Sequence, residues 1–353
     1  MNTMVWVGSY TDESLAGIHV LDVDPAAGEL RPLNVLKGIE NPTYLALNRA
    51  RTRLYTVCSR APGAPRDAAG AVAAYAIEGA SLRRLNMCPT PGSVPCHLSL
   101  APDEQTLVFA EYAGGHAGLL ALDANGALAS DSLVTVRHKG RGPDPVRQES
   151  AHAHFAAVTP DGRWLTVCDL GLDQVILYDF AHARQGLRAD PARAFHAAPG
   201  AGPRHLRFHP NGRLAFLLNE LDSTVVALRY TGESFEEIQT IRALPDDFAG
   251  ESKAAALKVT PDGRCLITSN RGFDSLTTFA IDPGSGRLER LAISPLTGAF
   301  PRDFELLPDG RTLLVGHKLS NEIACYAFDP ASGAITRQPG TYPVHRPTCI
   351  VAG

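Results

Sequence analysis

Apolar and polar residues alternate in short runs that come in pairs, and a turn sequence such as Pro-Asp-Gly joins the two runs of a pair. The clear copies, followed by two weaker ones, are residues 154–170, 205–221, 256–271, 304–318, 97–112 and 44–59. Alternation with a period of two is typical of half-buried strands. In Pro-Asp-Gly the proline presets φ and the glycine supplies a positive φ. The pattern therefore predicts pairs of antiparallel strands.

These pairs recur at a nearly constant spacing. Their turns lie near residues 50, 102, 160, 210, 261 and 308. A third alternating run follows in four copies, at residues 175–180, 224–230, 276–282 and 323–329, and a short fourth run comes after it. Four antiparallel strands per unit and a period of roughly 50 residues are typical of the blades of a β-propeller.

The two ends of the chain supply one further blade. Six complete repeats run from residue 41 to about residue 340, and residues 345–353 look like a first strand alone. Apolar runs near the N-terminus look like a second, third and fourth strand. We therefore expect an all-β, seven-bladed propeller that forms a single domain over residues 1–353. Pairing of residues 347–352 with the N-terminal strands closes the last blade and removes an open sheet edge.

Composition narrows the functional classes. The chain has 353 residues, 44% of them hydrophobic and 20% charged, which is typical of globular proteins and excludes disorder. A net charge of −4 argues against a dedicated nucleic-acid binder. No apolar run approaches the roughly 18 residues of a membrane span, and the N-terminus lacks the features of a signal peptide. Seven cysteines without a CxxC motif suggest reduced thiols. We expect a cytoplasmic monomer or weak homodimer that binds neither nucleic acid nor membranes.

Strand direction predicts where polar side chains gather. The start of a first strand and the end of a second strand lie at the same end of a blade, so polar residues at these places should line one mouth. The opposite end, marked by the Pro-Asp-Gly turns, has no comparable mixture of residue types. The candidates at the mouth, with one from the preceding loop, are His97, His152, His154, Arg204, Glu220, Lys253, Arg271, Arg302, Lys318 and Arg147.

Each candidate also has a structural explanation. Charged residues at strand ends are commonly solvated, the arginines could form ion pairs between blades, and His97 could be a core histidine. His152 and His154 are spaced to hold a metal from one strand face, but no third ligand is evident, so we expect neither a metal nor another cofactor. The chain has no GxSxG elbow and no SxxK pair, which argues against a serine nucleophile.

Several phrases carry a resemblance to a known family. These phrases are residues 147–162, 202–225, 269–276 and 300–316. They resemble the seven-bladed lactonase family, which includes propeller-type 6-phosphogluconolactonases and carboxymuconate-lactonizing enzymes. The resemblance covers essentially the whole chain. It implies a metal-independent site on one face of the propeller, with His154, Arg204, Glu220 and Arg271 as its catalytic and binding groups.

One departure from the family concerns the end of a second strand. The family commonly has an Ala-Asn-Tyr-like phrase there, and this chain has Ala110-Glu111-Tyr112. The additional carboxylate is expected to disfavour an anionic phosphate nearby unless that carboxylate is paired.

The candidate groups suit the opening of a lactone. Such a reaction needs a water molecule that is deprotonated as it attacks and a donor for the developing oxyanion. Glu220 or His154 can serve as the base, and Arg204 and Arg271 can hold the carbonyl oxygen or an anionic substituent.

The expected reaction is hydrolysis of a small-molecule lactone, foremost 6-phosphogluconolactone. Its alternatives are a carboxymuconate or neutral aldonolactone lactonase or cycloisomerase, and a non-enzymatic propeller that binds another protein. The expected substrate-binding residues are His97, His152, Lys253, Arg302, Lys318 and Arg147. The excess of basic groups among them favours an anionic substrate.

Overall fold

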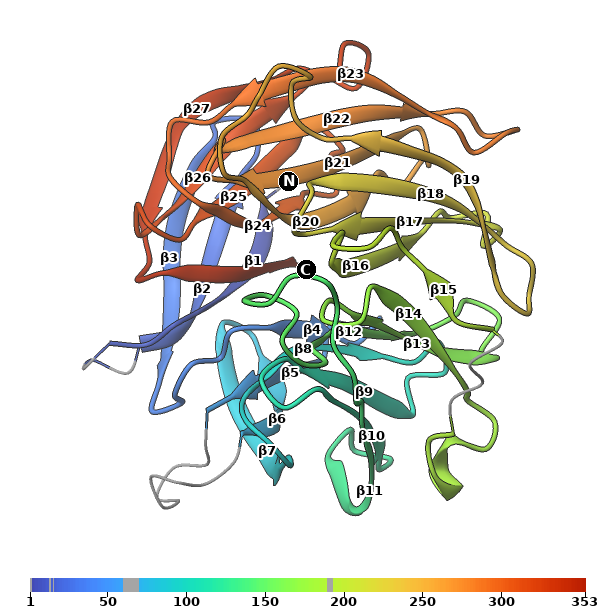
Figure 1. The fold of residues 1–353 in the computed structure, drawn as a ribbon. Helices are drawn as coiled ribbons and strands as arrows, with labels where there is room; N and C mark the ends of the chain where they lie inside the picture. Colours follow the sequence, from blue (N-terminus) through green and yellow to red (C-terminus); the bar gives the residue numbers. More distant parts are fainter. Residues whose placement is uncertain (1, 13, 15, 60–69, 189–192) are drawn as a thin grey trace. The chain divides into compact units, whose positions relative to one another are not determined.

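Strands dominate the structure. The computed structural model describes residues 2–12, 14, 16–59, 70–188 and 193–353. In this part of the chain, 28 strands form seven four-stranded antiparallel sheets, beside one short 3-10 helix, η1 (Ala183–Gln185) (Figure 1). The expected all-β fold with four antiparallel strands per blade is confirmed. The shortest strand is the outer one of the third repeat, β15 (Phe195–His196).

Contacts within the chain divide it into two compact units, which we describe separately. Unit 1 comprises Met1–Ser9, His19–Leu33 and Arg204–Gly353, and unit 2 comprises Tyr10–Ile18 and Asn34–Pro203. The expectation that residues 1–353 form a single domain stays a prediction.

Three sheets belong to unit 2, each with its strands in sequence order. Their strands are β4 (Leu45–Leu47), β5 (Arg53–Cys58), β6 (Ala71–Glu78) and β7 (Ser81–Pro89); β8 (Pro95–Leu100), β9 (Thr106–Glu111), β10 (His116–Leu122) and β11 (Leu128–Arg137); and β12 (Ala153–Val158), β13 (Trp164–Asp169), β14 (Gln174–Asp179) and β15.

Four sheets lie largely in unit 1, and the fourth joins the two ends of the chain. Their strands are β16 (Pro203–Phe208), β17 (Leu214–Asn219), β18 (Thr224–Tyr230) and β19 (Phe235–Arg242); β20 (Lys253–Val259), β21 (Cys265–Arg271), β22 (Ser275–Ile281) and β23 (Leu288–Pro295); β24 (Pro301–Leu306), β25 (Thr312–His317), β26 (Glu322–Phe328) and β27 (Ile335–Pro343); and β28 (Pro347–Ala352), β1 (Thr3–Ser9), β2 (Ala16–Asp24) and β3 (Glu29–Lys37).

The composite sheet confirms the predicted pairing of the terminal strands. β28 lies antiparallel to β1, with Val5 opposite Ala352 and Val7 opposite Ile350 (Figure 1). The strand runs from Pro347 to Ala352, the bounds expected for the segment that pairs with the N-terminal strands. Arg346 interrupts the extended backbone with a φ of +45°, and its amide donates to Asn321 Oδ1 at 2.9 Å. Residues 345 and 346 therefore belong to the turn before the strand.

The turns between first and second strands have the predicted chemistry. Gly162 and Gly263 have φ values of +73° and +74°, which an L side chain rarely adopts. In the two weaker copies Arg51 and Glu104 take nearly the same conformation, with φ values of 56° and 55°. The turn geometry is thus kept where glycine is absent, because the flanking strands fix the direction of the chain.

Apolar faces of neighbouring sheets form the core within each unit. In unit 1, Phe216 of β17 packs in one cluster with Leu266 and Phe279 of the next sheet. In unit 2, Tyr55 and Phe109 belong to a similar cluster between two sheets. Full burial of one such side chain contributes about 1.5–3 kcal/mol relative to exposure. This packing fixes the strand ends that carry the candidate residues.

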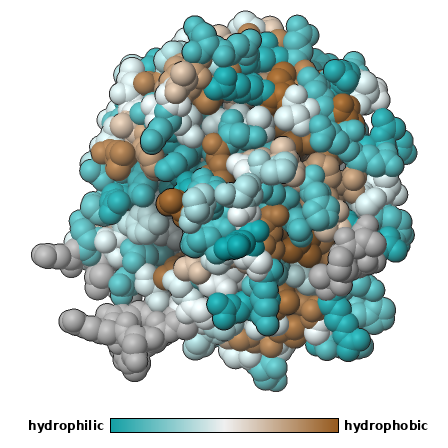
Figure 2. Space-filling model, viewed as in Figure 1, coloured by the Kyte–Doolittle hydropathy of each residue, from teal (hydrophilic) through white to brown (hydrophobic). Residues whose placement is uncertain are grey.

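Polar residues cover most of the face drawn in Figure 2, with apolar residues interspersed. Within the described ranges, the large apolar side chains that are exposed are Leu33, Val146 and Leu319, at separate places in the chain. Scattered apolar residues of this kind are normal on a folded protein. Among the described residues, no helix has the length and apolar character needed to cross a membrane.

Candidate active site

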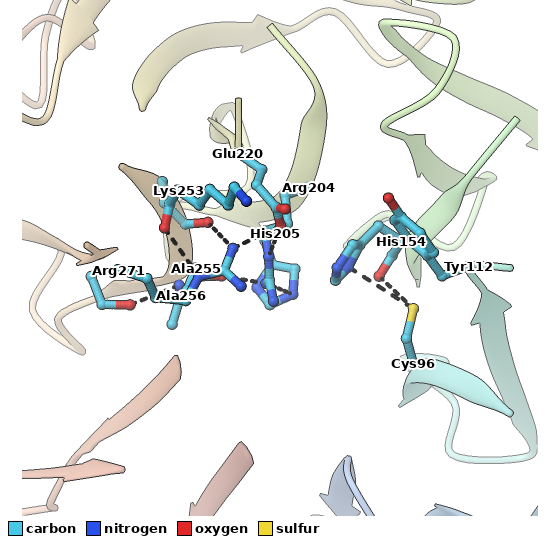
Figure 3. A network of polar contacts seen from close by, with 12 residues as sticks. Cys96, Tyr112, His154, Arg204, His205, Glu220, Lys253, Ala255, Ala256 and Arg271 are labelled. Carbon is cyan, nitrogen blue, oxygen red and sulfur yellow. Dashed lines mark hydrogen bonds and ion pairs between the residues drawn. The ribbon is translucent and has the colours of Figure 1, made fainter. Parts of the chain in front are cut away.

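Three buried charged side chains form the centre of the candidate site in unit 1. Arg204 is the second residue of β16, Glu220 follows the last residue of β17, and Arg271 ends β21. Glu220 Oε2 lies 2.8 Å from Arg204 Nε and 2.9 Å from an Nη atom of Arg271 (Figure 3). All three side chains are at most 5% exposed. We call this group the Arg204–Glu220–Arg271 cluster.

Backbone and imidazole acceptors fix the orientation of the two guanidinium groups. Arg271 donates to the carbonyl oxygens of Lys253 (3.0 Å) and Ala254 (2.9 Å). Arg204 donates to the Ala255 carbonyl and to His205 Nε2, the latter at 2.8 Å. Because arginine has no acceptor, His205 Nε2 must accept, and its ring proton therefore lies on Nδ1. Both guanidinium groups are held in fixed positions.

The cluster carries two cations and one anion. Burial lowers the pKa of Arg271 to about 9, and Arg204 and Arg302 act in the same direction, whereas Glu220 opposes them. The net charge of the cluster remains positive. Cationic donors that are fixed in position and shielded from water are suited to stabilise an oxygen on which negative charge develops.

The sheet register explains why these residues share one end of a blade. Lys253, the first residue of β20, lies opposite Arg271, the last residue of β21. In the next sheet Pro301 of β24 lies opposite His317 of β25. The same relation holds in unit 2, where Pro95 faces Glu111. The prediction that first-strand starts and second-strand ends lie together within a blade is confirmed.

In unit 2, His154 lies on the inner strand β12 and is also buried. Its Nδ1 is 3.9 Å from Cys96 Sγ, and the same thiol donates to the His154 carbonyl at 3.5 Å (Figure 3). The ring of Tyr112 meets the His154 ring edge-on, with the centroids 5.6 Å apart. Cys96 was not among the candidates, and Tyr112 directly follows Glu111, the last residue of β9.

His152 is engaged on both ring nitrogens. Nδ1 lies 2.9 Å from the Tyr112 carbonyl oxygen, and Nε2 lies 3.2 Å from Glu149 Oε1. The ring also stacks on Tyr112 at 4.2 Å. A backbone hydrogen bond and the bond to His152 lower the pKa of Glu149. This placement fits a role in holding the preceding loop against Tyr112.

A buried network fixes the backbone at His152. The Asp169 carboxylate accepts from the His152 amide at 2.8 Å, and its other oxygen lies 2.6 Å from His138 Nδ1. His138 Nε2 in turn lies 2.7 Å from the Tyr178 hydroxyl. Burial raises the pKa of Tyr178 above its ordinary value, so its hydroxyl stays protonated. The network holds the start of β12, the strand that carries His154.

The other two candidates of unit 2 lie in different surroundings. His97 is fully buried, and its ring packs against Tyr44 and Phe155 with centroid distances of 4.3 Å each. This environment fits a packing role rather than contact with a substrate. Arg147 lies on the loop before β12, where its guanidinium is 3.4 Å from the Tyr112 hydroxyl.

Glu111 is fully buried and paired. Both carboxylate oxygens accept from the Gly114 amide at 2.9 Å, and Oε2 lies 2.9 Å from His116 Nδ1. Its charge therefore stabilises the turn between β9 and β10. The structure therefore shows Glu111 in the paired case, hydrogen-bonded to an amide and an imidazole.

The remaining candidates, Lys253, Arg302 and Lys318, lie in unit 1 on the same sheet ends as the cluster or beside them. Among the described residues, no group of three His, Cys, Asp or Glu side chains is arranged to hold a metal ion. Metal independence stays a prediction.

The chain is similar to a known family and to several known proteins. The family model described as "Lactonase, 7-bladed beta-propeller" matches residues 4–352. An uncharacterized protein from Lactococcus lactis is 37% identical over 306 residues, which is 86% of each chain. The 6-phosphogluconolactonase of Bacillus subtilis is 36% identical over 303 residues, covering 85% of this chain and 83% of the relative.

The chain is also similar to a solved structure over its whole length. The periplasmic gluconolactonase of Pseudomonas aeruginosa superposes with a TM-score of 0.92 and 32% identity, covering 100% of this chain and 99% of that protein. The match to the family model spans nearly all residues and includes all seven sheets, so the seven-bladed fold class is confirmed. The chain belongs to the lactonase family of seven-bladed β-propellers and is a hydrolase of lactone esters.

Proposed function

We propose that this lactonase hydrolyses 6-phosphogluconolactone to 6-phosphogluconate. The observation that carries the proposal is the Arg204–Glu220–Arg271 cluster, in which two buried guanidinium groups share one carboxylate. Attack of water on a lactone carbonyl places negative charge on the carbonyl oxygen. Donors that are oriented before the reaction stabilise that charge without reorganising.

Each group of the cluster has a proposed part in the reaction. Arg204 and Arg271 hold the carbonyl oxygen as it becomes an oxyanion, and Glu220 keeps their guanidinium groups in place. A base removes the proton of the attacking water, the ring C–O bond breaks, and the ring oxygen leaves as a hydroxyl after it takes up a proton. Glu220 and His154 are the two candidates for the base.

The names of two relatives point to different lactone substrates. The Bacillus relative is named for the phosphorylated substrate and the Pseudomonas relative for gluconolactone, at similar identities to this chain. We favour the phosphorylated lactone because Arg302, Lys318 and Lys253 add basic side chains in the same unit as the cluster. The neutral gluconolactone is the comparison that tests this preference.

The experiment is a lactone panel followed by titration at constant pH. The purified protein is assayed with 6-phosphogluconolactone, gluconolactone and a carboxymuconate lactone, each against its spontaneous hydrolysis and with or without a chelator. We expect the highest kcat/KM for 6-phosphogluconolactone and no effect of the chelator. Absence of turnover with every lactone would contradict the proposed function, and loss of activity in chelator would contradict metal independence.

A cytoplasmic location and a monomeric or weakly dimeric state stay predictions. The Pseudomonas relative is described as periplasmic, so membership of the family is compatible with either compartment. Fractionation of cells that express the native gene, followed by immunodetection, decides between them.

A further inference from the structure

A second group of basic side chains lies at strand ends in unit 1. Arg302 is the second residue of β24, Lys318 follows the last residue of β25, and Arg346 precedes β28. The first strands of these sheets, β24 and β28, pack side by side, and β24 also packs against β21, which ends at Arg271. In three neighbouring sheets, basic residues therefore lie either beside the start of the first strand or at the end of the second strand.

Phe300 lies between this group and the Arg204–Glu220–Arg271 cluster. Lys318 Nζ is 5.5 Å from the centre of the Phe300 ring, and Arg271 Cζ is 5.2 Å from the same centre. Both cations are within the range of a cation–π contact. Lys318 and Arg271 thus both lie beside the same aromatic ring.

The backbone holds Phe300 firmly. Its φ is +63°, an uncommon value for a residue with a side chain. Its amide donates to Asp274 Oδ1 at 2.9 Å, and its carbonyl accepts from the Lys318 amide at 3.0 Å. A strained conformation that neighbouring hydrogen bonds maintain is a frequent property of functional sites.

The surroundings of the group are electrostatically unfavourable for cations. Burial lowers the pKa of Lys318 to about 8, and Arg302, Arg346 and Arg271 add to this effect. Over the described ranges, the guanidinium of Arg302 makes no hydrogen bond or ion pair. The carboxylate of the adjacent Asp303 is directed elsewhere, since it accepts from the Ile350 amide at 2.8 Å. An anionic ligand would relieve the repulsion among these cations.

We propose that Arg302, Lys318 and Arg346 form a subsite for the phosphate of the substrate, with Phe300 fixing its distance from Arg271. The inference rests on the proposed function and specifies how the phosphorylated lactone is distinguished from a neutral one. A phosphate offers several oxygens to guanidinium and ammonium donors. The neutral lactone has a hydroxyl at that place and gains little from three cations.

Binding of the reaction products tests the subsite without turnover. Isothermal titration calorimetry compares 6-phosphogluconate with gluconate for the wild type, Arg302→Gln, Lys318→Met and Lys318→Arg. We expect the wild type to prefer 6-phosphogluconate by at least about tenfold, since one hydrogen bond to a charged group contributes about that much. Arg302→Gln and Lys318→Met should each lower the affinity for 6-phosphogluconate about tenfold and leave gluconate unchanged, and Lys318→Arg should keep most of the preference.

Arg264→Gln is the matched control, because Arg264 is 85% exposed and lies in the turn at the other end of its blade. It should change neither affinity. Thermal melting of every variant shows whether it folds. If Lys318→Met does not fold, the affinities of Lys318→Arg and Arg302→Gln still test the subsite. Equal affinity of the wild type for both ligands, or equal losses for both in Arg302→Gln, would overturn the subsite.

The two proposals fail in different ways. If no lactone is hydrolysed but the preference for 6-phosphogluconate depends on Arg302, the proposed reaction is wrong and the phosphate subsite stands. If lactones are hydrolysed and Arg302→Gln leaves the ratio of kcat/KM values for phosphorylated and neutral lactones unchanged, the subsite is wrong and the lactonase reaction stands.

Discussion

Replacing Glu220 by alanine should destabilise the protein more than replacing either arginine beside it. The wild-type cluster has one carboxylate oxygen 2.8 Å and 2.9 Å from two guanidinium groups, all nearly excluded from solvent. Glu220→Ala leaves two buried cations without their shared anion, which costs about 3–5 kcal/mol. Arg271→Met leaves one cation facing one anion and an apolar side chain of similar length. It should therefore cost less than Glu220→Ala.

Urea unfolding followed by circular dichroism measures both effects at pH 7. The double variant Glu220→Ala/Arg271→Met completes the comparison, and we expect it to be more stable than Glu220→Ala alone because one of the stranded cations is gone. A free energy of unfolding for Glu220→Ala within about 1 kcal/mol of the wild type would refute the reasoning, since one buried partner is lost. So would a double variant that is less stable than Glu220→Ala.

Three other predictions concern catalysis, stability and closure of the composite sheet. Glu220→Gln should lower kcat by about 10²–10⁴-fold in stopped-flow assays if Glu220 is the base, whereas near-native kcat together with a loss in His154→Gln would assign the base to His154. The pKa of Lys318 lies at about 8 in the folded protein, below its ordinary 10.5, so the unfolded chain holds this proton more tightly. The free energy of unfolding therefore increases as pH rises from 8 to 10.5, and this gain is absent below pH 8. In urea unfolding, the free energy of unfolding of the wild type should increase relative to that of Lys318→Met between pH 7 and 10. A constant difference between the two proteins would contradict this. Deleting residues 345–353 removes the partner of β1 and should clearly lower the melting temperature, and wild-type melting would speak against the pairing.

The strand repeats were predictable because alternation and turn residues are local properties. Residues 224–230 were expected as a strand and form β18 with the same bounds. The pairing of the chain ends followed from counting incomplete repeats. The pairing of Glu111 with His116 was also predictable from the sequence, because a tight hairpin places the two residues opposite each other.

Side-chain environments were less predictable, because they depend on residues from other strands. His97 and His154 occupy similar places near the starts of first strands, yet His97 lies between two aromatic rings and His154 beside a thiol. Arg346 was overlooked although it directly precedes Pro347, the first residue of a first strand. The positive φ of Phe300 has no signature in the sequence, since its neighbours impose it.

The pairing of β1 with β28 has a consequence for synthesis of the chain on the ribosome. β1 is made well before its neighbour β28, which follows about 340 residues later along the chain. At about 5–20 residues per second, roughly 17–70 s pass between the two. During this time one edge of β1 exposes backbone N–H and C=O groups that can pair with another chain. The rate of translation, and any chaperone that covers β1 in the interval, therefore influences how much of the newly made protein reaches the native fold.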